Sequence, residues 1–583
     1  MNRLRTTWTL AFAAALVVAS CGSSTTASPS AGASAAASPS TAASEAATAA
    51  ASASAEASAS ASTAPVPSPT DQPLRVGWLS EPDTMNPLTS ETTESVEVTQ
   101  LIYDKLMDYG LDLKPEFELA TSFTQSPDGK AMTFKLRDGV KWQDGQPFTS
   151  ADVAYTYNLI HDNSLGQYAQ FLLNLTGVKT PDPLTIELDF SAPQAFNPAL
   201  VVPIVPKHIW STMTVKQLEQ YPNDKPVGTG PYALTTKWVK GSPLTVTRND
   251  QWWGQLPSPA SITWVRYDNS DVMGQALRSG DLDIIPQVPP TVYDGMTGTD
   301  NVKAVALPSF SFHHIGFNVS STSTSKGNPL LKDLVVRQAI QDSVDRNQLV
   351  QLCLAGHGTT GDSIIPAGMS DWHLAIPAEQ QFNANPDKAK QILDAAGYTD
   401  PNNTGVRSKD GKPLEFRLIA INTTDVDVCA AKLFVDAAAT IGVKLDLTTL
   451  DENTLSDTVY NKDAPNWDIF VWGWDSGALD PSYMLGVPLC SQIGGNNDVF
   501  YCNKSYDAQY AQQAITVDPA ARKAITDQMQ QEFYNDAAYL VMWYQDKLQA
   551  YRTDTWANWQ EIPGGIIFNF TRDNYLHIVP AAH

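Results

Sequence analysis

Apolar residues recur along this chain with two alternating periods. Alternating or continuous apolar runs predict strands at 74–79, 131–136, 184–190, 244–248, 262–267, 312–319, 414–421, 444–450 and 467–472. Helical spacing predicts helices at 94–107, 152–160, 272–279, 334–350, 386–396, 429–441 and 519–535. The last helix has Asp518 as a predicted N-cap and Pro519 at its first position. Strands that alternate with helices indicate an α/β fold. The sequence contains no internal repeat of fixed period.

The first 70 residues have a different pattern. Arg3 and Arg5 precede an apolar run, Trp8 to Ala19, that is shorter than the roughly 20 residues needed to span a bilayer. The segment Val18-Ala19-Ser20-Cys21 resembles a bacterial lipobox, which implies that residues 1–20 are removed and that Cys21 carries lipid. Ordinary secretory cleavage elsewhere, with Cys21 unmodified, is the alternative. From Gly22 to about Thr70 the chain is mostly Ala, Ser and Pro, which predicts a disordered linker.

Composition restricts the classes of partner. The formal charge is −24, and removing residues 1–20, which hold two arginines and no acid, leaves −26. Such an acidic surface argues against nucleic acid and against charge-driven binding to anionic lipid. About 510 residues follow the linker, enough for two or three domains. No second segment is apolar for long enough to cross a membrane, so lipid would be the anchor.

Four cysteines follow Cys21. In an oxidising compartment they suggest two disulfides, with three possible connectivities. Cys490 and Cys502 flank a Gly-Gly-Asn-Asn turn and form the preferred pair, which leaves Cys353 with Cys429. Buried free thiols are the alternative. The chain holds no Cys-x-x-Cys, so a redox motif or zinc ribbon is not expected.

A series of motifs resembles family 5 of the extracellular solute-binding proteins, the peptide-, nickel- and sugar-binding subunits of ABC importers. The motifs are LATSF at 119–123, SPDGK at 126–130, TFKLRDGVKW at 133–142, DGQPFTSADV at 144–153, VPKHI at 205–209, GTGPY at 228–232, ALRSGDLDI at 276–284, GFNV at 316–319, VRQAI at 336–340, VDR at 344–346 and KAKQILDAAGY at 388–398. They occur in the family's order, and the resemblance covers residues 72–583.

This resemblance implies a periplasmic-binding-protein-like type II α/β fold, with two main lobes, a hinge and a smaller inserted domain. Domain I would comprise 71–112, 225–312 and 551–583, domain II 113–224, and domain III 313–550. The two lobes would close over the ligand by hinge bending. The implied function is that of a monomeric, non-enzymatic lipoprotein on the outer face of the bacterial cell membrane. It would need no cofactor, would capture a solute, foremost an oligopeptide, and would deliver it to separate permease and ATPase subunits. An oligosaccharide or other small solute, and a sensory instead of an import role, remain alternatives.

The most informative site candidate is Trp472-Gly473-Trp474-Asp475. In the resembling peptide-binding proteins a tryptophan here lines the pocket, and an aspartate a few residues on pairs with the peptide's α-ammonium. The aligned position in this chain is Gly477, and Asp480 looks like the family's structural Asp-Pro. We therefore expect Trp474, Trp472 and Asp475 to bind ligand, with Asp475 replacing the usual aspartate or with a ligand that lacks a free amine. The alternative is that both tryptophans belong to the core.

Weaker candidates follow from the same alignment. They are Gln287, Phe310, Phe312, Trp543, Tyr544, Asp83, Thr84 and Tyr168. Aromatic side chains offer stacking and apolar surface to varied ligands. Each of these residues could equally belong to the core.

The sequence gives little indication of hydrolytic catalysis or metal binding. No Gly-x-Ser-x-Gly or His-Glu-x-x-His motif occurs, and a Ser-x-x-Lys match at 323–326 lies in a polar loop, so a secreted hydrolase is not favoured. His313 and His314 are adjacent on a predicted strand and would point to opposite faces, so no metal site is expected there.

Overall fold

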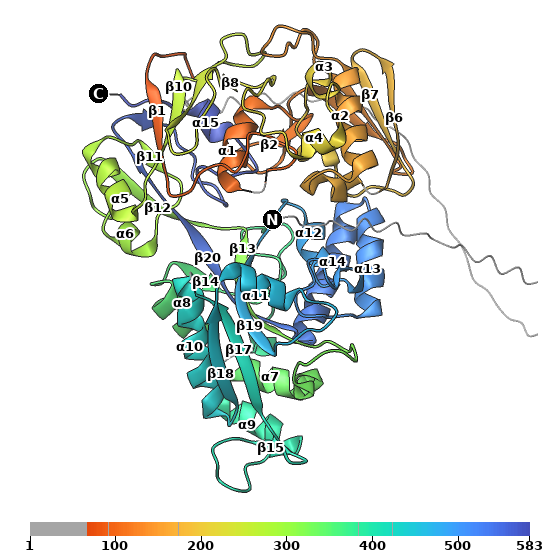
Figure 1. Ribbon diagram of the computed structural model, residues 1–583, viewed down its shortest axis with the longest axis vertical. Coiled ribbons are helices and arrows are strands. Elements are labelled where there is room, and N and C mark those ends of the chain that lie inside the picture. Colours follow the sequence, from red (N-terminus) through yellow and green to blue (C-terminus); the bar gives the residue numbers. More distant parts are fainter. Residues whose placement is uncertain (1–66, 91, 173, 383, 423, 583) are drawn as a thin grey trace, which may run out of the picture. The chain divides into compact units, whose positions relative to one another are not determined.

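Two lobes meet at one long strand. The computed structural model describes residues 67–582 except 91, 173, 383 and 423, and the leader, Cys21 and most of the linker lie outside them. The strand β20 (Tyr539–Arg552) belongs to a sheet of order β18-β17-β19-β13-β20-β11-β1-β10-β9-β8, and it also pairs with β12 and β14. Its first half pairs with β13 and β14, and its second half with β12 and β11 (Figure 1). We call the part built on β1 the β1 lobe (67–308 and 553–582) and the part built on β17 the β17 lobe (311–538).

The β1 lobe combines a sheet with helices from three chain segments. Its elements are β1 (Pro73–Trp78), α1 (Thr93–Ile102), β2 (Met107–Tyr109), β3 (Pro115–Phe117), β8 (Tyr232–Ala233), β9 (Leu244–Arg248), β10 (Ser261–Arg266), α5 (Ser270–Ser279), β11 (Ile284–Ile285), α6 (Pro290–Asp294), β12 (Val302–Pro308), β21 (Trp556–Ala557), α15 (Asp573–His577) and β22 (Val579–Pro580). Strand β1 is parallel to β10 over its whole length, which brings 73–78 beside 261–266.

An inserted unit carries its own four-stranded antiparallel sheet of order β4-β5-β7-β6. It contains β4 (Ala120–Gln125), β5 (Ala131–Leu136), α2 (Ser150–Asn163), η1 (Gln167–Leu172), β6 (Leu175–Asp182), β7 (Thr185–Phe190), η2 (Pro198–Leu200), α3 (Lys207–Trp210) and α4 (Val215–Glu219). Helix α2 begins at a capping box, in which the N-cap Thr149 and Asp152 satisfy each other's backbone amides. The Asp-Gly turns of the sequence motifs thus serve this unit's hairpins and loops.

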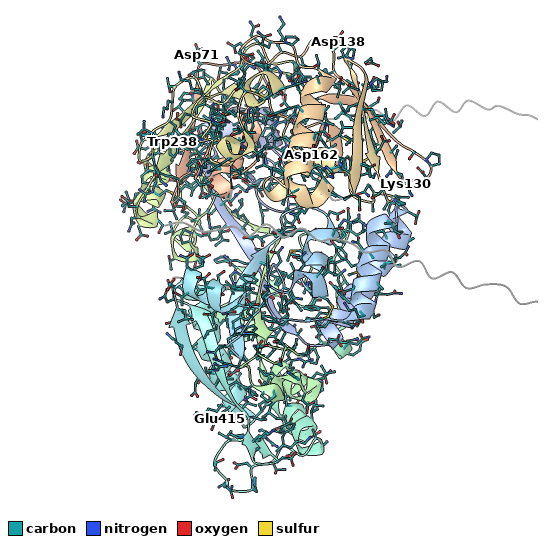
Figure 2. All side chains as sticks on the ribbon, turned by 45° about the vertical axis from the view of Figure 1, so that its right-hand side comes forward. Asp71, Lys130, Asp138, Asp162, Trp238 and Glu415 are labelled. Carbon is teal, nitrogen blue, oxygen red and sulfur yellow. A yellow bond between two sulfur atoms is a disulfide. The ribbon has the colours of Figure 1, made fainter. Side chains whose placement is uncertain are left out.

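The β17 lobe is an α/β layer followed by helices. It contains β13 (Ser311–Phe317), η3 (Pro329–Lys332), α7 (Leu334–Ser343), α8 (Arg346–Cys353), β14 (Gly358–Thr360), η4 (Ala378–Gln380), α9 (Pro386–Ala395), β15 (Ser408–Lys409), β16 (Lys412–Pro413), β17 (Glu415–Ile421), α10 (Asp425–Thr440), β18 (Lys444–Leu450), α11 (Glu452–Val459), β19 (Ile469–Asp475), α12 (Pro481–Gly486), η5 (Cys490–Gln492), α13 (Lys504–Ile515) and α14 (Pro519–Asn535). Side chains fill the interior of both lobes (Figure 2).

Most predicted elements are present, and two differences have clear causes. The single helix predicted at 334–350 is broken into α7 and α8, because Val344 is extended and Asp345 caps α8 through the N–H of Gln348. Strand β20 was not predicted, because its first six residues are buried and therefore show no polar alternation. The domain boundaries drawn from the sequence stay predictions. In the part of the chain that the structure describes, no helix is both long and apolar enough to cross a bilayer.

Buried charges attach the C-terminal segment to the β1 lobe. The guanidinium of Arg572 lies 2.6 Å from Asp104 and 2.5 Å from Glu118, and it also donates to the carbonyl oxygen of Gln100. Nearby, Glu97 on α1 accepts hydrogen bonds from Trp78, Trp264 and Tyr575, which joins α1 to two strands and to α15. Arg572 and Tyr575 therefore anchor the C-terminal segment in the lobe's interior.

We expect Arg572→Ala to lower the free energy of unfolding by about 3–5 kcal/mol, because it leaves Asp104 and Glu118 buried without their cation. Urea unfolding followed by tryptophan fluorescence measures the change. The control is Arg266→Ala, which removes an exposed pair with Asp268 and should cost less than about 1 kcal/mol. Equal losses in the two variants would contradict the structural role of Arg572.

Candidate ligand-binding site

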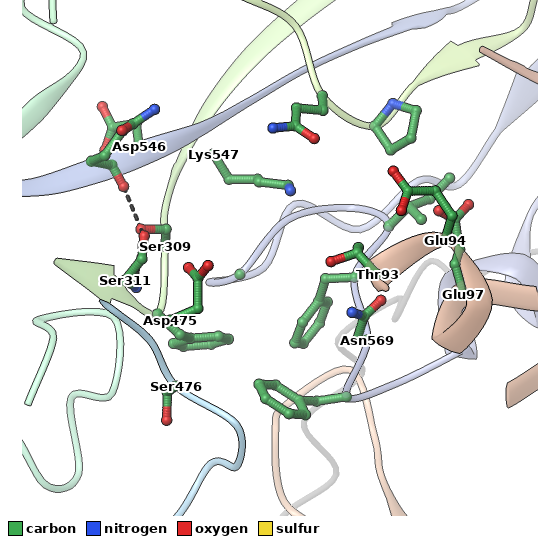
Figure 3. A pocket seen from close by; sticks show the side chains of 18 of the residues that line it. Thr93, Glu94, Glu97, Ser309, Ser311, Asp475, Ser476, Asp546, Lys547 and Asn569 are labelled. Carbon is green, nitrogen blue, oxygen red and sulfur yellow. Dashed lines mark hydrogen bonds between the residues drawn. The ribbon is translucent and has the colours of Figure 1, made fainter. Parts of the chain in front are cut away.

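A cavity of about 370 Å³ lies between the lobes, where β20 passes from one to the other. Residues of both lobes form its walls: Gly77, Trp78, Leu79, Thr93, Glu94, Glu97, Pro286, Gln287, Ser309, Phe310, Ser311, His313, Asp475, Ser476, Gln545, Asp546, Lys547, Gly564, Ile567, Phe568, Asn569 and Phe570. Figure 3 shows the side chains of Lys547 and Asp475 directed into this space, with Glu94 on the far wall. Cavities of this size accommodate small ligands.

The cation of the cavity is Lys547, which β20 presents at the cleft. Its neighbours along the strand are buried on both sides, whereas Gln545, Asp546 and Lys547 are only half-buried. The ammonium of Lys547 forms no ion pair or hydrogen bond with the residues described. Burial lowers the pKa of Lys547, and the more distant carboxylates of Asp475, Glu97 and Glu94 partly oppose this effect. An ammonium held without a partner is ready to bind an anionic group of a ligand.

Several carboxylates share the cavity. Asp475 is exposed to it, and its carboxylate has no hydrogen-bond partner within residues 67–582 as described. Burial raises the pKa of Glu94 and of Asp546. Glu97 differs from them because its oxygens already accept three hydrogen bonds from the core. The site therefore has Asp475 and Glu94 as acceptors for a ligand cation.

A histidine completes the charged wall. His313 lies on β13, and its Nδ1 is 2.7 Å from Asp427 on α10. Burial opposes protonation of His313, but Asp427 outweighs it and raises the pKa of the imidazole. The neighbouring His314 points the other way and is fully buried beside Asp498. The two histidines thus face opposite sides of the strand, as predicted. No group of three metal-ligating side chains occurs in the described part of the chain.

A smaller cavity of about 150 Å³ adjoins the first and shares Ser476, Asn569 and Phe570 with it. Tyr168 of η1 and Gly477 contribute to its walls. The open space therefore continues from the charged cavity toward the inserted unit.

Four of the predicted residues lie at these cavities. Gln287, Phe310 and Asp475 line the larger one, and Tyr168 lines the smaller one. Gln287 follows Pro286 at the end of β11, and Phe310 precedes β13, so both lie where a strand of the large sheet reaches the cleft. Gln287 and Asp475, nearly 190 positions apart in the sequence, thus line the same cavity.

The two tryptophans lie elsewhere. Trp472 and Trp474 both donate through Nε1 to Asp498, at 2.9 and 3.0 Å. Trp472 is buried in the β17 lobe, and Trp474 is half-buried against the same apolar cluster. They share one face of β19, as predicted, but Asp475 follows on the other face, because successive strand residues point to opposite sides. Asp475 therefore lines the larger cavity without either tryptophan, and ligand binding by Trp472 and Trp474 stays a prediction.

The remaining candidates are held in packing or capping roles. Phe312 is opposite Trp474 on the core face of β13, and Trp543 is fully buried. The hydroxyl of Tyr544 donates to Asp362 at 2.8 Å. Asp83 accepts from Ser95 and Thr92 at the start of α1, and Thr84 donates to the carbonyl oxygen of Pro222. None of these side chains is a wall residue of the two cavities.

Both preferred disulfides form. Cys353 on α8 joins Cys429 on α10, and Cys490 joins Cys502. The first links two helices on one side of the β17 lobe, and the second closes a loop beside α12 and α13. Lipidation of Cys21 falls outside the described residues.

Lys547 was the main omission of the sequence analysis. Its signal was the polar triplet Gln545-Asp546-Lys547 between two apolar runs. The sequence prediction named instead Trp543 and Tyr544, four and three positions earlier on the same strand.

Comparison with known proteins identifies what this chain is similar to. Residues 114–496 match the sequence model for "Bacterial extracellular solute-binding proteins, family 5 Middle". The chain is 27% identical to the oligopeptide-binding protein AppA of Bacillus subtilis over 481 residues, 81% of this chain and 86% of AppA. It is 26% identical to the glutathione-binding protein GsiB of Salmonella typhimurium, over 82% of this chain and 90% of GsiB.

A solved structure extends the comparison to the fold. The crystal structure of Bacillus subtilis AppA in complex with a nonapeptide superimposes with a TM-score of 0.73 at 24% identity, covering 88% of this chain and all of that one. The predicted fold class, a type II periplasmic-binding-protein fold, is thereby confirmed. The relatives are binding proteins and not enzymes.

We expect Lys547→Met to raise the free energy of unfolding of the ligand-free protein by about 0.5–2 kcal/mol, because it removes a partly buried charge that has no partner within the described chain. Chemical denaturation at neutral pH measures the change. The control is Lys303→Met on β12, which loses a 2.5 Å ion pair with Glu561 and should not be stabilised.

The lowered pKa of Lys547 also determines how the free energy of unfolding changes with pH. Between the folded pKa of Lys547 and the unfolded value of about 10.4, the unfolded chain holds more protons, so the stability of the wild-type protein rises with pH. The difference in free energy of unfolding between Lys547→Met and the wild type therefore becomes smaller as the pH approaches 10. A stability gain that does not change with pH, or a variant less stable than the wild type, would contradict the description of Lys547 as an unpartnered charge.

Proposed function

Because the chain belongs to family 5 of the bacterial extracellular solute-binding proteins, we propose that it captures an oligopeptide between its lobes and delivers it to an ABC permease. The observation that carries this proposal is the pairing of opposite charges in one cavity: Lys547 without a partner among the described residues, across from Asp475 and Glu94. A ligand that brings both an ammonium and a carboxylate satisfies both walls. Peptides have this chemistry, and AppA and GsiB are named for peptide ligands.

In this proposal the α-ammonium of the peptide pairs with Asp475, which stands in for the aspartate missing at position 477. A carboxylate of the ligand pairs with Lys547. That carboxylate comes either from an acidic first residue or, in a short peptide, from the carboxyl end. Charge-assisted hydrogen bonds of this kind are about twice as strong as neutral ones. Asp475 belongs to the β17 lobe and Glu94 to the β1 lobe, while Lys547 lies on the strand that crosses between them. A ligand that contacts residues of both lobes stabilises the closed arrangement.

The experiment is calorimetric titration of residues 71–583 with three tetrapeptides: Glu-Ala-Phe-Ala, its N-acetyl form, and Ala-Ala-Phe-Ala. We expect acetylation to weaken binding at least tenfold. Asp475→Asn should weaken the free-amine peptide by about 10–150-fold, the loss of one hydrogen bond to a charged group, and should not weaken the acetylated one further. Asp436→Asn, an exposed aspartate on α10, serves as the matched control and should bind as the wild type does.

The comparison of Glu-Ala-Phe-Ala with Ala-Ala-Phe-Ala separates the two sources of carboxylate. If Glu-Ala-Phe-Ala binds more tightly and Lys547→Met removes the difference, Lys547 binds the acidic side chain of the ligand. Equal affinities that both fall in Lys547→Met assign it to the carboxyl end. Absence of binding by every tetrapeptide at millimolar concentration would overturn the proposal of a peptide ligand.

We further propose that Cys21 carries the lipid that holds the protein on the outer face of the cell membrane. Two observations support it: the lipobox-like sequence Val18-Ala19-Ser20-Cys21, and a linker of about fifty residues before the folded body.

We expect Cys21→Ser to shift the protein from the membrane fraction to the medium or to soluble extracts, and to abolish incorporation of a labelled fatty acid. Ser23→Ala is the control and should remain membrane-bound. A Cys21→Ser protein that stays with the membrane and is still acylated would remove Cys21 as the anchor.

A further inference from the structure

A histidine, a serine and a carboxylate share one face of the sheet at the 370 Å³ cavity. His313 and Ser311 are two positions apart on β13, and the residue between them, Phe312, is buried in the core. Ser311 lies directly opposite Asp475 on β19 (Figure 3). Residues two apart on a strand, and residues directly opposite across two strands, point to the same face. Ser311, His313 and Asp475 accordingly all line the cavity.

Gly473 makes the room that the ring of His313 occupies. It lies opposite His313 in the register of β13 and β19. A Cβ atom at position 473 would lie 2.8 Å from Nε2 and 2.9 Å from Cδ2 of the imidazole, closer than side chains pack. Glycine at this position therefore lets the ring lie across β19, and the glycine of the Trp-Gly-Trp-Asp motif is explained by the histidine opposite it.

Asp427 on α10 determines which nitrogen of His313 is left for a ligand. Its buried carboxylate lies 2.7 Å from Nδ1. Because a carboxylate only accepts, the proton of this hydrogen bond belongs to Nδ1. Nε2 has no hydrogen-bond partner among the residues described. Nε2 is therefore an acceptor when the ring is neutral and a donor when the ring is protonated.

The hydroxyl of Ser311 is also left as an acceptor. Ser309 donates its own hydroxyl proton to the carbonyl oxygen of Gln545, which can only accept. The 2.8 Å hydrogen bond between the hydroxyls of Ser309 and Ser311 therefore uses the proton of Ser311. The lone pairs of Ser311 stay available, opposite the carboxylate of Asp475. Together with neutral His313 these groups present three acceptors on one wall.

The proton on His313 is held by carboxylates of two neighbouring elements. Burial opposes protonation of the ring, but Asp427 on α10 and Asp475 on β19 outweigh it and raise the pKa of His313. From β20 the uncharged ring of Trp543 packs 5.5 Å away. The other charged groups at the cavity are Glu94 and Glu97 of α1 and Asp546 and Lys547 of β20. A cation that pairs with Asp475 removes part of the support for the proton on His313.

Resting on the proposed function, we propose that Asp475, Ser311 and His313 form a site for a primary ammonium, and that the ligand displaces a proton from His313. The three N–H groups of the ammonium donate to the carboxylate of Asp475, the hydroxyl of Ser311 and Nε2 of His313. Before the ligand arrives Nε2 carries a proton, which passes to the solvent as the ammonium enters. Asp427 is a positioning residue, since it holds the second proton on Nδ1. Acid therefore weakens capture of the ligand.

The test is calorimetric titration of residues 71–583 with Glu-Ala-Phe-Ala at pH 6, in cacodylate and in MES, two buffers that differ in ionisation enthalpy. We expect a binding enthalpy that depends on the buffer and corresponds to release of up to one proton per peptide. His313→Gln should bind without this release, because its amide keeps an acceptor that does not titrate. The matched control is His208→Gln, which removes a histidine 2.7 Å from Asp144 outside the cavity and should keep the release.

The pH profile separates a bound histidine from a merely structural one. Between about pH 7.5 and pH 6 the affinity of the wild-type protein should fall by up to about tenfold per unit, since one proton is exchanged. The affinity of His313→Gln should stay nearly constant over this range. Asp427→Asn should move the fall to lower pH, because it removes a carboxylate that favours the protonated ring.

A methylated ligand separates hydrogen bonding from charge. The Nα,Nα-dimethyl form of Glu-Ala-Phe-Ala stays cationic at pH 6 but offers one N–H, so we expect it to bind at least about tenfold more weakly. If the free peptide binds but the dimethyl form binds equally well, or if His313→Gln releases as many protons as the wild type, the three-acceptor site is wrong and the peptide-binding function stands. If no peptide binds, both proposals are wrong.

Discussion

The arrangement of this protein depends on the sharing of one strand by two cores. Strand β20 is hydrogen-bonded to β13 and β14 in its first half and to β12 and β11 in its second. Its first six and last five residues are buried in one lobe or the other, and the three between them are not. The strand therefore creates the cleft simply by leaving one core before it enters the next. The residues at that crossing, Gln545 to Lys547, become walls of the cavity.

Strand alternation then decides which chemistry reaches the cavity. On β13 and β19 the pairs Ser311–Asp475 and His313–Gly473 lie toward the cleft, whereas Phe312–Trp474 lies toward the core of the β17 lobe. The core face is fixed by Asp498, a buried carboxylate that accepts from Trp472, Trp474 and Tyr539. The Nε1 groups of both tryptophans are therefore committed to that buried acid, since an unpaired buried carboxylate would be costly. The register that buries the tryptophans also exposes Asp475.

Charges inside the β1 lobe are satisfied, whereas the cation in the cleft is not. Arg572 has Asp104 and Glu118, and Glu97 has three donors. Lys547 lacks such a partner within the chain as described, although carboxylates share its cavity. A partly buried ammonium without a countercharge costs stability, in contrast to the paired charges of the β1 lobe.

The sequence by itself determined the alternation of strands and helices, the N-cap of α14, a preference among the disulfide pairings and the family. These features depend on local periodicity or on motifs several residues long, which can be recognised without knowing which distant residues contact one another. Within the candidate site it identified Gln287, Phe310, Asp475 and Tyr168, which flank strand or helix ends that meet at the cleft. Only the tertiary structure decided that Trp474 turns inward, that Lys547 faces the cavity, and that Gly477 borders Tyr483. Each of these outcomes depends on which face of a strand meets the gap between two cores. That choice is made by hydrogen bonds between residues far apart in the chain, which no local pattern contains.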